Sequence, residues 1–386
     1  MYMRPFPSGG RVYHTHTVKE NMDFINLKGQ YQAYREEIDG EIRDVLSSQR
    51  FILGEKGKAL EEELSSFVGS RYAVAVASGT DALALSLRSL GVSPGDEVIT
   101  TPFTFIATAE AIAMVGATPV FCDIEKDTFN IDPDRFEERT TELTKGIIVV
   151  DIFGCPAEYE KVRAIARQYG LFILQDGAQS FGAKRDGKRS PSMGDMGITS
   201  FFPAKPLGCF GDGGMIFTDV KSLARKSEAL RNHGQTARYV HSYLGQNSRL
   251  DEIQAAVLLV KSRHFEEELT KRQKIARFYD ANLPEGMVQQ RVAEEVLSSY
   301  AQYSILVPDR DGLAMFLSDK GIPTAIHYPV PIHLQESFRH LGYGPGDFPV
   351  SEDISGRILS LPFSPFMSRE DLERVIASLL DYTGRG

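Results

Sequence analysis

The stretch at 146–179, GIIVVDIFGCPAEYEKVRAIARQYGLFILQDGAQ, decides the fold class. It begins with an apolar, β-branched run (146–152), continues with an amphipathic segment of helix length (158–169), and ends with a second apolar run (172–175). Two buried strands joined by a helix are the repeating unit of a parallel sheet, because the helix returns the chain to the edge where the first strand began. The stretch therefore predicts an α/β protein.

The same alternation extends to both sides of this unit. The runs with strand character are 72–77, 97–101, 118–123, 146–152, 172–175, 197–201 and 214–218. Helical patterns lie between most of them, at 82–90, 107–115, 133–140 and 158–169. We therefore predict a large domain built on a seven-stranded, mostly parallel sheet.

The pattern changes after Thr218. Two long helical segments, at 221–231 and from 250 toward 279, follow each other with no strand expected between them. A strand at 304–307 and helices at 312–320 and 369–380 then indicate a smaller α+β unit. We divide the chain into an N-terminal extension (1–21), a large domain (22–260), and a small C-terminal domain (261–386) that includes the linking helix.

Composition excludes several classes of function. The 386 residues carry 43 basic and 52 acidic side chains, a net charge of −9, which argues against binding nucleic acid or an anionic membrane. The sequence has no run of about 18 apolar residues, so we expect no membrane helix. The three cysteines and eight histidines have no metal-ligand spacing, so we expect no metal. A cytoplasmic enzyme that acts on a small molecule is the expectation.

Ligands of a parallel sheet collect beyond the carboxyl ends of its strands, so the loops there are the candidate site. After the first strand, Ser78, Gly79 and Thr80 open a helix whose free N–H groups and positive dipole end suit a phosphate. An ordinary helix cap is the alternative. After the second strand, Phe105 either stacks on a planar ring or belongs to the core.

Two charged residues complete this set. Asp176 follows an apolar strand, where an unpaired carboxylate is costly, so it needs a cationic partner. That partner is either Lys205 or a protonated heterocyclic nitrogen. Lys205 lies in the segment SFFPAKPLGCFGDGG (200–214), beside three phenylalanines. Loss of hydration there lowers the pKa of the ammonium, and a neutral amine is a nucleophile.

A phosphate cradle, a stacking aromatic, an acid for a ring nitrogen and a desolvated lysine together fit pyridoxal 5′-phosphate (PLP). The carboxylate keeps the pyridine nitrogen protonated, so that the ring accepts electrons, and the lysine holds the aldehyde and later moves a proton. The glycines at 208, 211, 213 and 214 form no G-x-G-x-x-G pattern, so a dinucleotide is not indicated. We predict PLP as the cofactor.

From residue 22 to its end, the chain resembles the DegT/DnrJ/EryC1/StrS family of sugar aminotransferases, which have the aspartate-aminotransferase-like fold (fold type I). The matching motifs are SGTDAL (78–83), TPFTF (101–105), DGAQ (176–179), SFFPAK (200–205), GDGG (211–214), NSRLD (247–251) and HYP (327–329). The resemblance implies transfer of an amino group from L-glutamate to a nucleotide-linked keto sugar. It also implies a homodimer with shared active sites.

The resemblance assigns cofactor-binding roles to matching residues. It implies that Gly79, Thr80 and Ser200 contact the cofactor phosphate. It further implies that Phe105 stacks on the ring and that Gln179 approaches the phenolic oxygen of the ring.

The same comparison assigns the chemistry. It implies that Asp176 pairs with the ring nitrogen and that Lys205 is the Schiff-base lysine and proton shuttle. These two residues are the predicted catalytic pair. Asn247 is expected to reach the phosphate bound by the neighbouring subunit.

The segments at 205–214 and 247–251 most resemble members that aminate C3 of UDP-2-acetamido-2-deoxy-3-oxo-D-glucuronate during polysaccharide and O-antigen assembly. We therefore expect this acceptor. Arg249, His327 and Tyr328 are the expected substrate-binding residues, because a guanidinium binds a carboxylate through two parallel hydrogen bonds. As alternatives, Arg249 caps the following helix and His327 is a satisfied strand residue.

Other functions stay open at this point. The alternative acceptor is a dTDP-linked 3-keto-6-deoxyhexose or a 4-keto sugar. Sugar dehydratases of the family have histidine in place of Lys205, so this lysine favours amino transfer. A lyase or desulfurase needs a cysteine on a mobile loop, whereas Cys209 lies between glycine and phenylalanine. A regulatory PLP-binding protein is the non-enzyme alternative, against which Lys205 and Asp176 both argue.

The basic segment AKRDGKRS (183–190) has two interpretations. Its charges suit a nucleotide phosphate, while Asp186 and Gly187 between two short arms are typical of a hairpin turn. We favour the hairpin.

Overall fold

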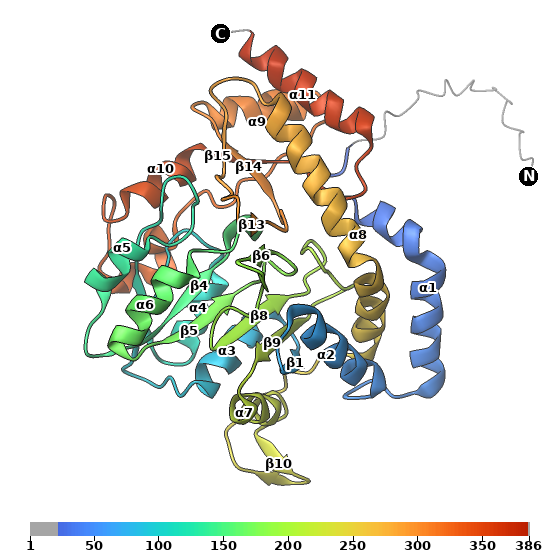
Figure 1. Ribbon diagram of the computed structural model, residues 1–386, viewed down its shortest axis with the longest axis vertical. Coiled ribbons are helices and arrows are strands. Elements are labelled where there is room, and N and C mark those ends of the chain that lie inside the picture. Colours follow the sequence, from blue (N-terminus) through green and yellow to red (C-terminus); the bar gives the residue numbers. More distant parts are fainter. Residues whose placement is uncertain (1–21, 385–386) are drawn as a thin grey trace, which may run out of the picture.

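The computed structural model describes residues 22–384, and the predicted N-terminal extension (1–21) lies outside them. Its largest sheet has the strand order β1-β9-β8-β5-β4-β2-β3 (Figure 1). The strands are β1 (Tyr72–Val76), β2 (Glu97–Thr100), β3 (Thr118–Phe121), β4 (Thr144–Val150), β5 (Phe172–Asp176), β8 (Met196–Ser200) and β9 (Gly214–Thr218). Only β9 runs antiparallel to its neighbours. The predicted seven-stranded, mostly parallel sheet is confirmed.

Helices cover both faces of this sheet. One face carries α3 (Gly79–Ser89), α4 (Ala107–Met114) and α7 (Lys221–Arg231), and the other carries α2 (Glu55–Val68), α6 (Tyr159–Tyr169) and α8 (Glu252–Asn282). Successive strand residues point to opposite faces. Ile148 and Leu174 therefore pack with α3, while Ile147 and Ile173 pack with α6. A strand with two buried faces is a nearly continuous apolar run, as the sequence showed.

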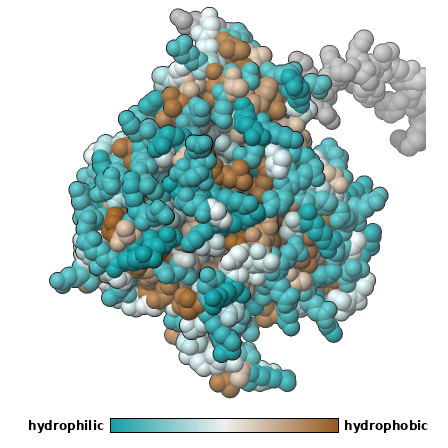
Figure 2. All heavy atoms as spheres, viewed as in Figure 1, coloured by the Kyte–Doolittle hydropathy of each residue, from teal (hydrophilic) through white to brown (hydrophobic). Residues whose placement is uncertain are grey.

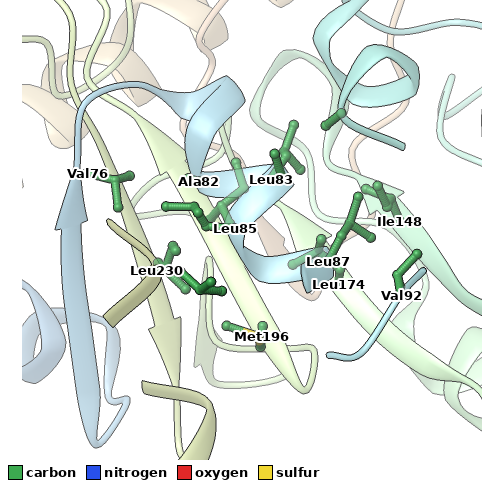
Figure 3. Packing of buried hydrophobic residues seen from close by; sticks show 14 of the residues in the cluster. Val76, Ala82, Leu83, Leu85, Leu87, Val92, Ile148, Leu174, Met196 and Leu230 are labelled. Carbon is green, nitrogen blue, oxygen red and sulfur yellow. The ribbon is translucent and has the colours of Figure 1, made fainter. Parts of the chain in front are cut away.

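The packing of α3 fixes one side of the candidate site. Leu85 and Leu87 of this helix point into the cluster that contains Leu174 and Met196 (Figure 3). Full burial of a leucine side chain contributes about 1.5–3 kcal/mol. The helix starts at Gly79, three residues before the helical pattern at 82–90, and the Ser78 side chain caps it as the sequence suggested. Its N-terminus is thereby held at the carboxyl end of β1.

The C-terminal part forms a second, smaller core. An antiparallel sheet of β12 (Val288–Gln289), β14 (Tyr303–Leu306) and β15 (Ile358–Leu361) packs with α9 (Arg310–Asp319) and α11 (Arg369–Thr383). Helix α8 joins the two cores: Leu258 packs in the large one and Tyr279 in the small one (Figure 1). Because α8 crosses residues 260 and 261 without a break, the domain boundary stays a prediction.

The N-terminal helix α1 (Leu27–Ser48) lies along α8 (Figure 1). Tyr34 and Ile38 of α1 pack against Val257 and Val260 of α8. Another helix, α10 (Pro349–Arg357), packs through Ile354 with the buried aromatic residues beside the candidate site. The predicted helix at 133–140 is shorter, because α5 (Pro133–Phe136) continues only as a 3-10 turn.

The expectation of no strand between α7 and α8 is wrong. The antiparallel pair β10 (Gln235–Ala237) and β11 (Val240–His241) lies there and projects from the body of the molecule (Figure 1). Its strands are too short and too polar to show an alternating apolar pattern. Figure 2 shows hydrophobic residues at the projecting end, in agreement with 54% exposure of Val240 in β11.

The hairpin interpretation of the basic segment is confirmed. Strands β6 (Lys184–Arg185) and β7 (Lys188–Arg189) pair through a two-residue turn at Asp186 and Gly187, which have φ values of 50° and 75°. Arg185 forms an ion pair with Glu295 at 3.2 Å, and Arg189 forms one with Glu266 at 2.6 Å. These arginines are thus neutralised within the chain.

None of the helices between residues 22 and 384 combines the length and the apolar composition that crossing a membrane requires. Within the same residues, no group of three or more histidine, cysteine, aspartate or glutamate side chains is arranged to hold a metal ion.

Candidate active site

A cavity of about 480 Å³ lies at the carboxyl ends of β1, β4, β5 and β8. The sequence-predicted residues that line it are Gly79, Thr80, Phe105, Asp176, Gln179, Ser200, Lys205, His327 and Tyr328. They come from separate loops of the sheet and from the C-terminal part of the chain. Their roles stay predictions, but the fold brings them to one place, as the strand order requires.

The N-terminus of α3 forms one end of the cavity. Ser78 Oγ accepts a hydrogen bond from the Asp81 N–H at 3.0 Å, so this hydroxyl caps the helix. The N–H groups of Gly79 and Thr80 belong to the first turn, where no helical carbonyl accepts them. A Cβ atom on Gly79 would lie only 2.8 Å from Ser200 Cβ, so glycine is required for α3 to approach the end of β8. The helix cap and the predicted phosphate site are therefore compatible with each other.

Asp176 lies at the end of β5 and is 5% exposed. Its carboxylate accepts hydrogen bonds from Thr108 Oγ1 at 2.8 Å and from the Ala178 N–H at 3.2 Å. Burial raises the pKa of Asp176, while these two hydrogen bonds and the positive charge of Lys205 lower it. With only two neutral donors, the carboxylate is short of partners and suits a cationic ring nitrogen.

Lys205 lies in a tight loop after β8. Its N–H donates to the Phe202 carbonyl at 2.8 Å, and the Cys209 N–H donates to the Phe201 carbonyl at 2.8 Å. Burial lowers the pKa of the Lys205 ammonium, and the negative charge of Asp176 acts in the opposite direction. A lowered pKa increases the share of neutral amine, as a nucleophile and proton shuttle needs.

The expected aromatic surroundings of Lys205 need one correction. Phe202 lines the cavity with it, but the ring of Phe210 lies 4.6 Å from the Nζ atom of another lysine, Lys261. Lys261 is 1% exposed, and its Nζ donates to the Gly208 carbonyl at 2.6 Å. The loop that carries Lys205 is therefore held from behind by a second buried lysine, which the sequence did not indicate.

Gln179 connects two walls of the cavity. Its Oε1 accepts from the Phe153 N–H at 2.7 Å, and its Nε2 donates to the Tyr328 hydroxyl at 3.1 Å. The rings of Tyr328 and Phe105 lie 6.0 Å apart, and Phe105 is 53% exposed. Phe105 is thus a cavity residue and not part of the core. Its exposed face can stack on a planar ring.

His327 is a neutral residue in this setting. Its Nδ1 lies 2.8 Å from Ser360 Oγ, and burial, assisted by the charge of Lys205, lowers its pKa to about 4. A neutral imidazole binds a carboxylate through a hydrogen bond and not through an ion pair. The predicted contact between His327 and a sugar carboxylate is weaker for this reason.

Asn247 and Arg249 do not line this cavity. They lie between β11 and α8, where Arg249 Nε donates to Asn247 Oδ1 at 2.8 Å and the Asn247 side chain is exposed. The fold therefore does not bring these two residues to the site that their own chain forms.

The sequence did not single out Thr108 or Gln302, which also line the cavity. Thr108 lies one turn after Phe105 on α4, and its hydroxyl reaches Asp176. The sequence signal that could have identified Thr108 is its position one helical turn after Phe105, which was already predicted to line the site. Gln302 comes from the C-terminal part, and no signal in the sequence connected it with the cavity.

The fold and the site together define a PLP-dependent enzyme of the aspartate-aminotransferase-like class. Comparison with known proteins gives the family. Residues 32–380 match the profile of the DegT/DnrJ/EryC1/StrS aminotransferase family. The chain belongs to this family, which confirms the resemblance found in the sequence.

Two relatives and two solved structures illustrate the likeness. The UDP-2-acetamido-2-deoxy-3-oxo-D-glucuronate aminotransferase of Pseudomonas aeruginosa is 42% identical over 93% of this chain and 99% of its own length. A pleiotropic regulatory protein of Geobacillus stearothermophilus is also 42% identical, over 94% and 98%. A DegT/DnrJ/EryC1/StrS aminotransferase from Brucella abortus is similar in structure, with a TM-score of 0.90, 40% identity and coverage of 94% and 100%.

The NtdA protein of Bacillus subtilis, solved with bound cofactor pyridoxamine phosphate, has a TM-score of 0.87, 29% identity and coverage of 94% of this chain and 85% of its own. Family and structural likeness confirm that the chain is an aminotransferase with PLP as its cofactor.

Proposed function

We propose that this protein transfers the amino group of L-glutamate to C3 of UDP-2-acetamido-2-deoxy-3-oxo-D-glucuronate in polysaccharide or O-antigen sugar biosynthesis. The observation that carries the amino transfer is the cavity itself, in which Lys205 and the poorly satisfied carboxylate of Asp176 meet the open N-terminus of α3. The choice of acceptor is supported by the relative from Pseudomonas aeruginosa that bears this activity in its name.

The residues of the cavity fit PLP. When bound, this cofactor supplies an electron-withdrawing ring next to the carbon that carries the transferred amino group. The N–H groups of Gly79 and Thr80 bind a phosphate, with Ser200 beside them. Asp176 keeps a ring nitrogen protonated, because its buried charge is stabilised by a cation. The exposed face of Phe105 orients a planar ring.

Lys205 moves the proton in this scheme. Its buried amine takes a proton from the donor amino acid in the first half-reaction and gives one to the acceptor in the second. The Phe202 and Gly208 carbonyls fix the loop around it, through the Lys205 N–H and Lys261 Nζ. A fixed position is important because the Lys205 amine must lie within reach of the carbon-bound proton that it takes or gives.

We further propose a homodimer in which Asn247 and Arg249 serve the cavity of the other subunit. Three observations support this arrangement: both residues lie outside their own cavity, they are joined by a hydrogen bond, and Tyr239 and Val240 of the neighbouring hairpin are exposed. Exposed apolar side chains on a projecting hairpin are typical of a contact surface. Sedimentation equilibrium tests the proposal, and a monomer at micromolar concentration contradicts it.

The acceptor is tested with a panel of UDP-linked and dTDP-linked 3-keto and 4-keto sugars, with L-glutamate as donor. We expect the UDP-linked 3-keto uronate to have the highest kcat/KM. A preference for a dTDP-linked 6-deoxy sugar would contradict the uronate assignment, while the amino transfer would stand. The panel also separates the alternative acceptors, since they differ in the keto position and in the substituent at C6.

Arg249→Ala tests the carboxylate contact. If Arg249 binds the C6 carboxylate, the variant has a lower kcat/KM for the uronate. The corresponding barrier rises by about 2–4 kcal/mol, because the carboxylate loses its charged partner. The acceptor with a hydroxymethyl group at C6 is the matched control and should be converted equally by both enzymes. An equal loss in the L-glutamate half-reaction would place Arg249 at the amino acid or at the dimer contact instead.

A regulatory role is the second candidate, favoured by the name of the relative from Geobacillus stearothermophilus. A protein that only senses PLP or a sugar would bind both and turn over neither. Purified protein that converts no keto sugar in the panel, with L-glutamate present, would favour this candidate.

A further inference from the structure

Gln302 carries an unsatisfied amide oxygen and lines the active-site cavity. Its Oε1 is buried and has no hydrogen-bond partner among residues 22–384, although the side chain lines the cavity. A buried carbonyl oxygen without a donor costs about 1–3 kcal/mol. Such a group persists in an active site when a ligand supplies the missing donor.

The backbone that carries Gln302 is held firmly. The Ser299 N–H donates to the Gly154 carbonyl at 3.0 Å, and the Ala301 N–H donates to the Phe153 carbonyl at 2.9 Å. Gly154 has φ of 100°, and a Cβ atom there would lie 2.5 Å from Ser299 Oγ, so the two segments cross as closely as glycine allows.

Two more contacts complete this support. Arg272 Nη1 donates to the Tyr300 carbonyl at 2.9 Å, and Ser299 Oγ donates to the Gln179 carbonyl at 2.9 Å. The segment 298–302 is therefore fastened to α8 on one side and to the loop of Gln179 on the other. Such a support fixes the backbone from which the Gln302 side chain extends to the cavity wall.

We propose that Gln302 is a specificity residue that accepts a hydrogen bond from a donor group next to the keto carbon of the acceptor sugar. This inference rests on the proposed function. In a 2-acetamido-3-keto sugar, the two donors next to C3 are the acetamido N–H at C2 and the hydroxyl at C4. Both present the chemistry that Oε1 lacks, and the experiment below distinguishes them.

Gln302 also reaches a second cavity of about 620 Å³, which provides the control. Gln289 lines this second cavity and not the active-site cavity. Methionine resembles glutamine in length and has no amide. Gln302→Met therefore removes the proposed contact with little change in volume, and Gln289→Met makes the same chemical change on the other side of the wall.

The experiment compares kcat/KM for the best acceptor of the wild-type enzyme with two analogues, one without the C2 substituent and one without the C4 hydroxyl. Gln302→Met should lower kcat/KM for the full acceptor by roughly 10- to 100-fold, mainly through KM. It should leave the L-glutamate half-reaction within about twofold of wild type. The analogue that lacks the recognised donor should be converted equally by wild type and variant, which identifies the donor. Gln289→Met should behave as wild type with all three.

Two results would overturn the proposal. One is an equal loss with all three acceptors or in the half-reaction, which would mean that Gln302 only supports the fold. The other is a variant with unchanged kcat/KM. Failure of the uronate assignment is visible separately, because it changes which acceptor the wild-type enzyme prefers and leaves the comparison of variants intact.

Discussion

Two buried carboxylates end neighbouring strands of the large sheet, and their surroundings differ sharply. Asp151 follows β4 and is fully buried, and it accepts hydrogen bonds from Ala157 N, Tyr159 OH, Gln175 Nε2, Ser180 Oγ and Ser190 Oγ at 2.7–3.2 Å. Asp176 is the last residue of β5, and among residues 22–384 its carboxylate accepts only from Thr108 and Ala178. The Asp151 N–H donates to the Asp176 carbonyl at 3.1 Å, so the two residues are adjacent.

The difference teaches how to tell a structural acid from a functional one. Burial raises the pKa of both carboxyl groups, to about 6 for Asp151. Asp151 is enclosed by donors of its own chain and needs nothing more. Asp176 faces a cavity with half of its hydrogen-bonding capacity unused, next to a lysine of lowered pKa. An incomplete set of partners, and not burial alone, indicates the site of chemistry.

The largest effect is expected on the cavity side, for Lys205→Ala. Without the amine that moves the proton, turnover should fall by at least about 10⁴-fold and become undetectable. The thermal midpoint should change little, because the Lys205 side chain donates no hydrogen bond to another residue in the described part of the chain, 22–384. Turnover of L-glutamate with the keto sugar and calorimetry of the same sample provide the measurement. Activity near that of wild type would remove Lys205 from the mechanism.

Asp176→Asn should lower the rate of the L-glutamate half-reaction by about 1000-fold, or about 4 kcal/mol in barrier height. An amide is neutral and cannot keep a ring nitrogen protonated. Stopped-flow absorbance of the loaded enzyme measures this rate. A rate within about threefold of wild type would mean that Asp176 is as structural as Asp151.

Asp151→Asn should affect stability and not chemistry. Because the folded-state pKa lies above the ordinary value of 3.8, the folded protein keeps a proton that the unfolded chain has lost between pH 4 and 6. Stability from this group is therefore largest below pH 4 and falls by up to about 3 kcal/mol as pH rises to 6. Urea unfolding at several pH values should show this decline in wild type and not in the variant. An identical pH profile in both proteins would contradict the assignment.

Thr108→Val removes one of the two hydrogen bonds to Asp176 at nearly constant volume. We expect a loss of only about 3- to 10-fold in the half-reaction, since a single neutral donor is worth roughly 0.5–1.5 kcal/mol. The pH optimum should shift upward, because a donor that lowers the pKa of Asp176 is gone. The matched control is Thr104→Val, whose hydroxyl contacts Thr108 and not the carboxylate. A larger loss than that of Asp176→Asn would contradict the role of Thr108 as a single neutral donor to Asp176.

Much of the cavity was predictable because it depends on local sequence. Asp176 ends an apolar run, Gly79 and Thr80 begin a helix, and Lys205 lies in a loop rich in glycine and aromatic residues. Parallel strands bring such loops together without further information. The fold class followed from the same alternation of strands and helices.

The rest depended on contacts between distant segments. Gln302 reaches the cavity because its segment crosses the loop at Gly154, a meeting that no periodic pattern records. Lys261 looks like any lysine of a long helix, and only the packing of α8 shows that it is buried. The hairpin β10–β11 escaped prediction because strands of two or three residues show no alternation.

Helix α8 has a further consequence for the geometry of the active site. Its 31 residues extend over about 46 Å, and the chain passes along it between the wall with Lys205 and the wall with His327 and Gln302. One residue added to an α-helix turns all that follows by about 100° and advances it by about 1.5 Å. The length of α8 thus sets the rotational phase between the two walls. Surface loops in general tolerate insertions. An insertion in the middle of α8 would instead rotate one wall of the cavity relative to the other, although no cavity residue had changed.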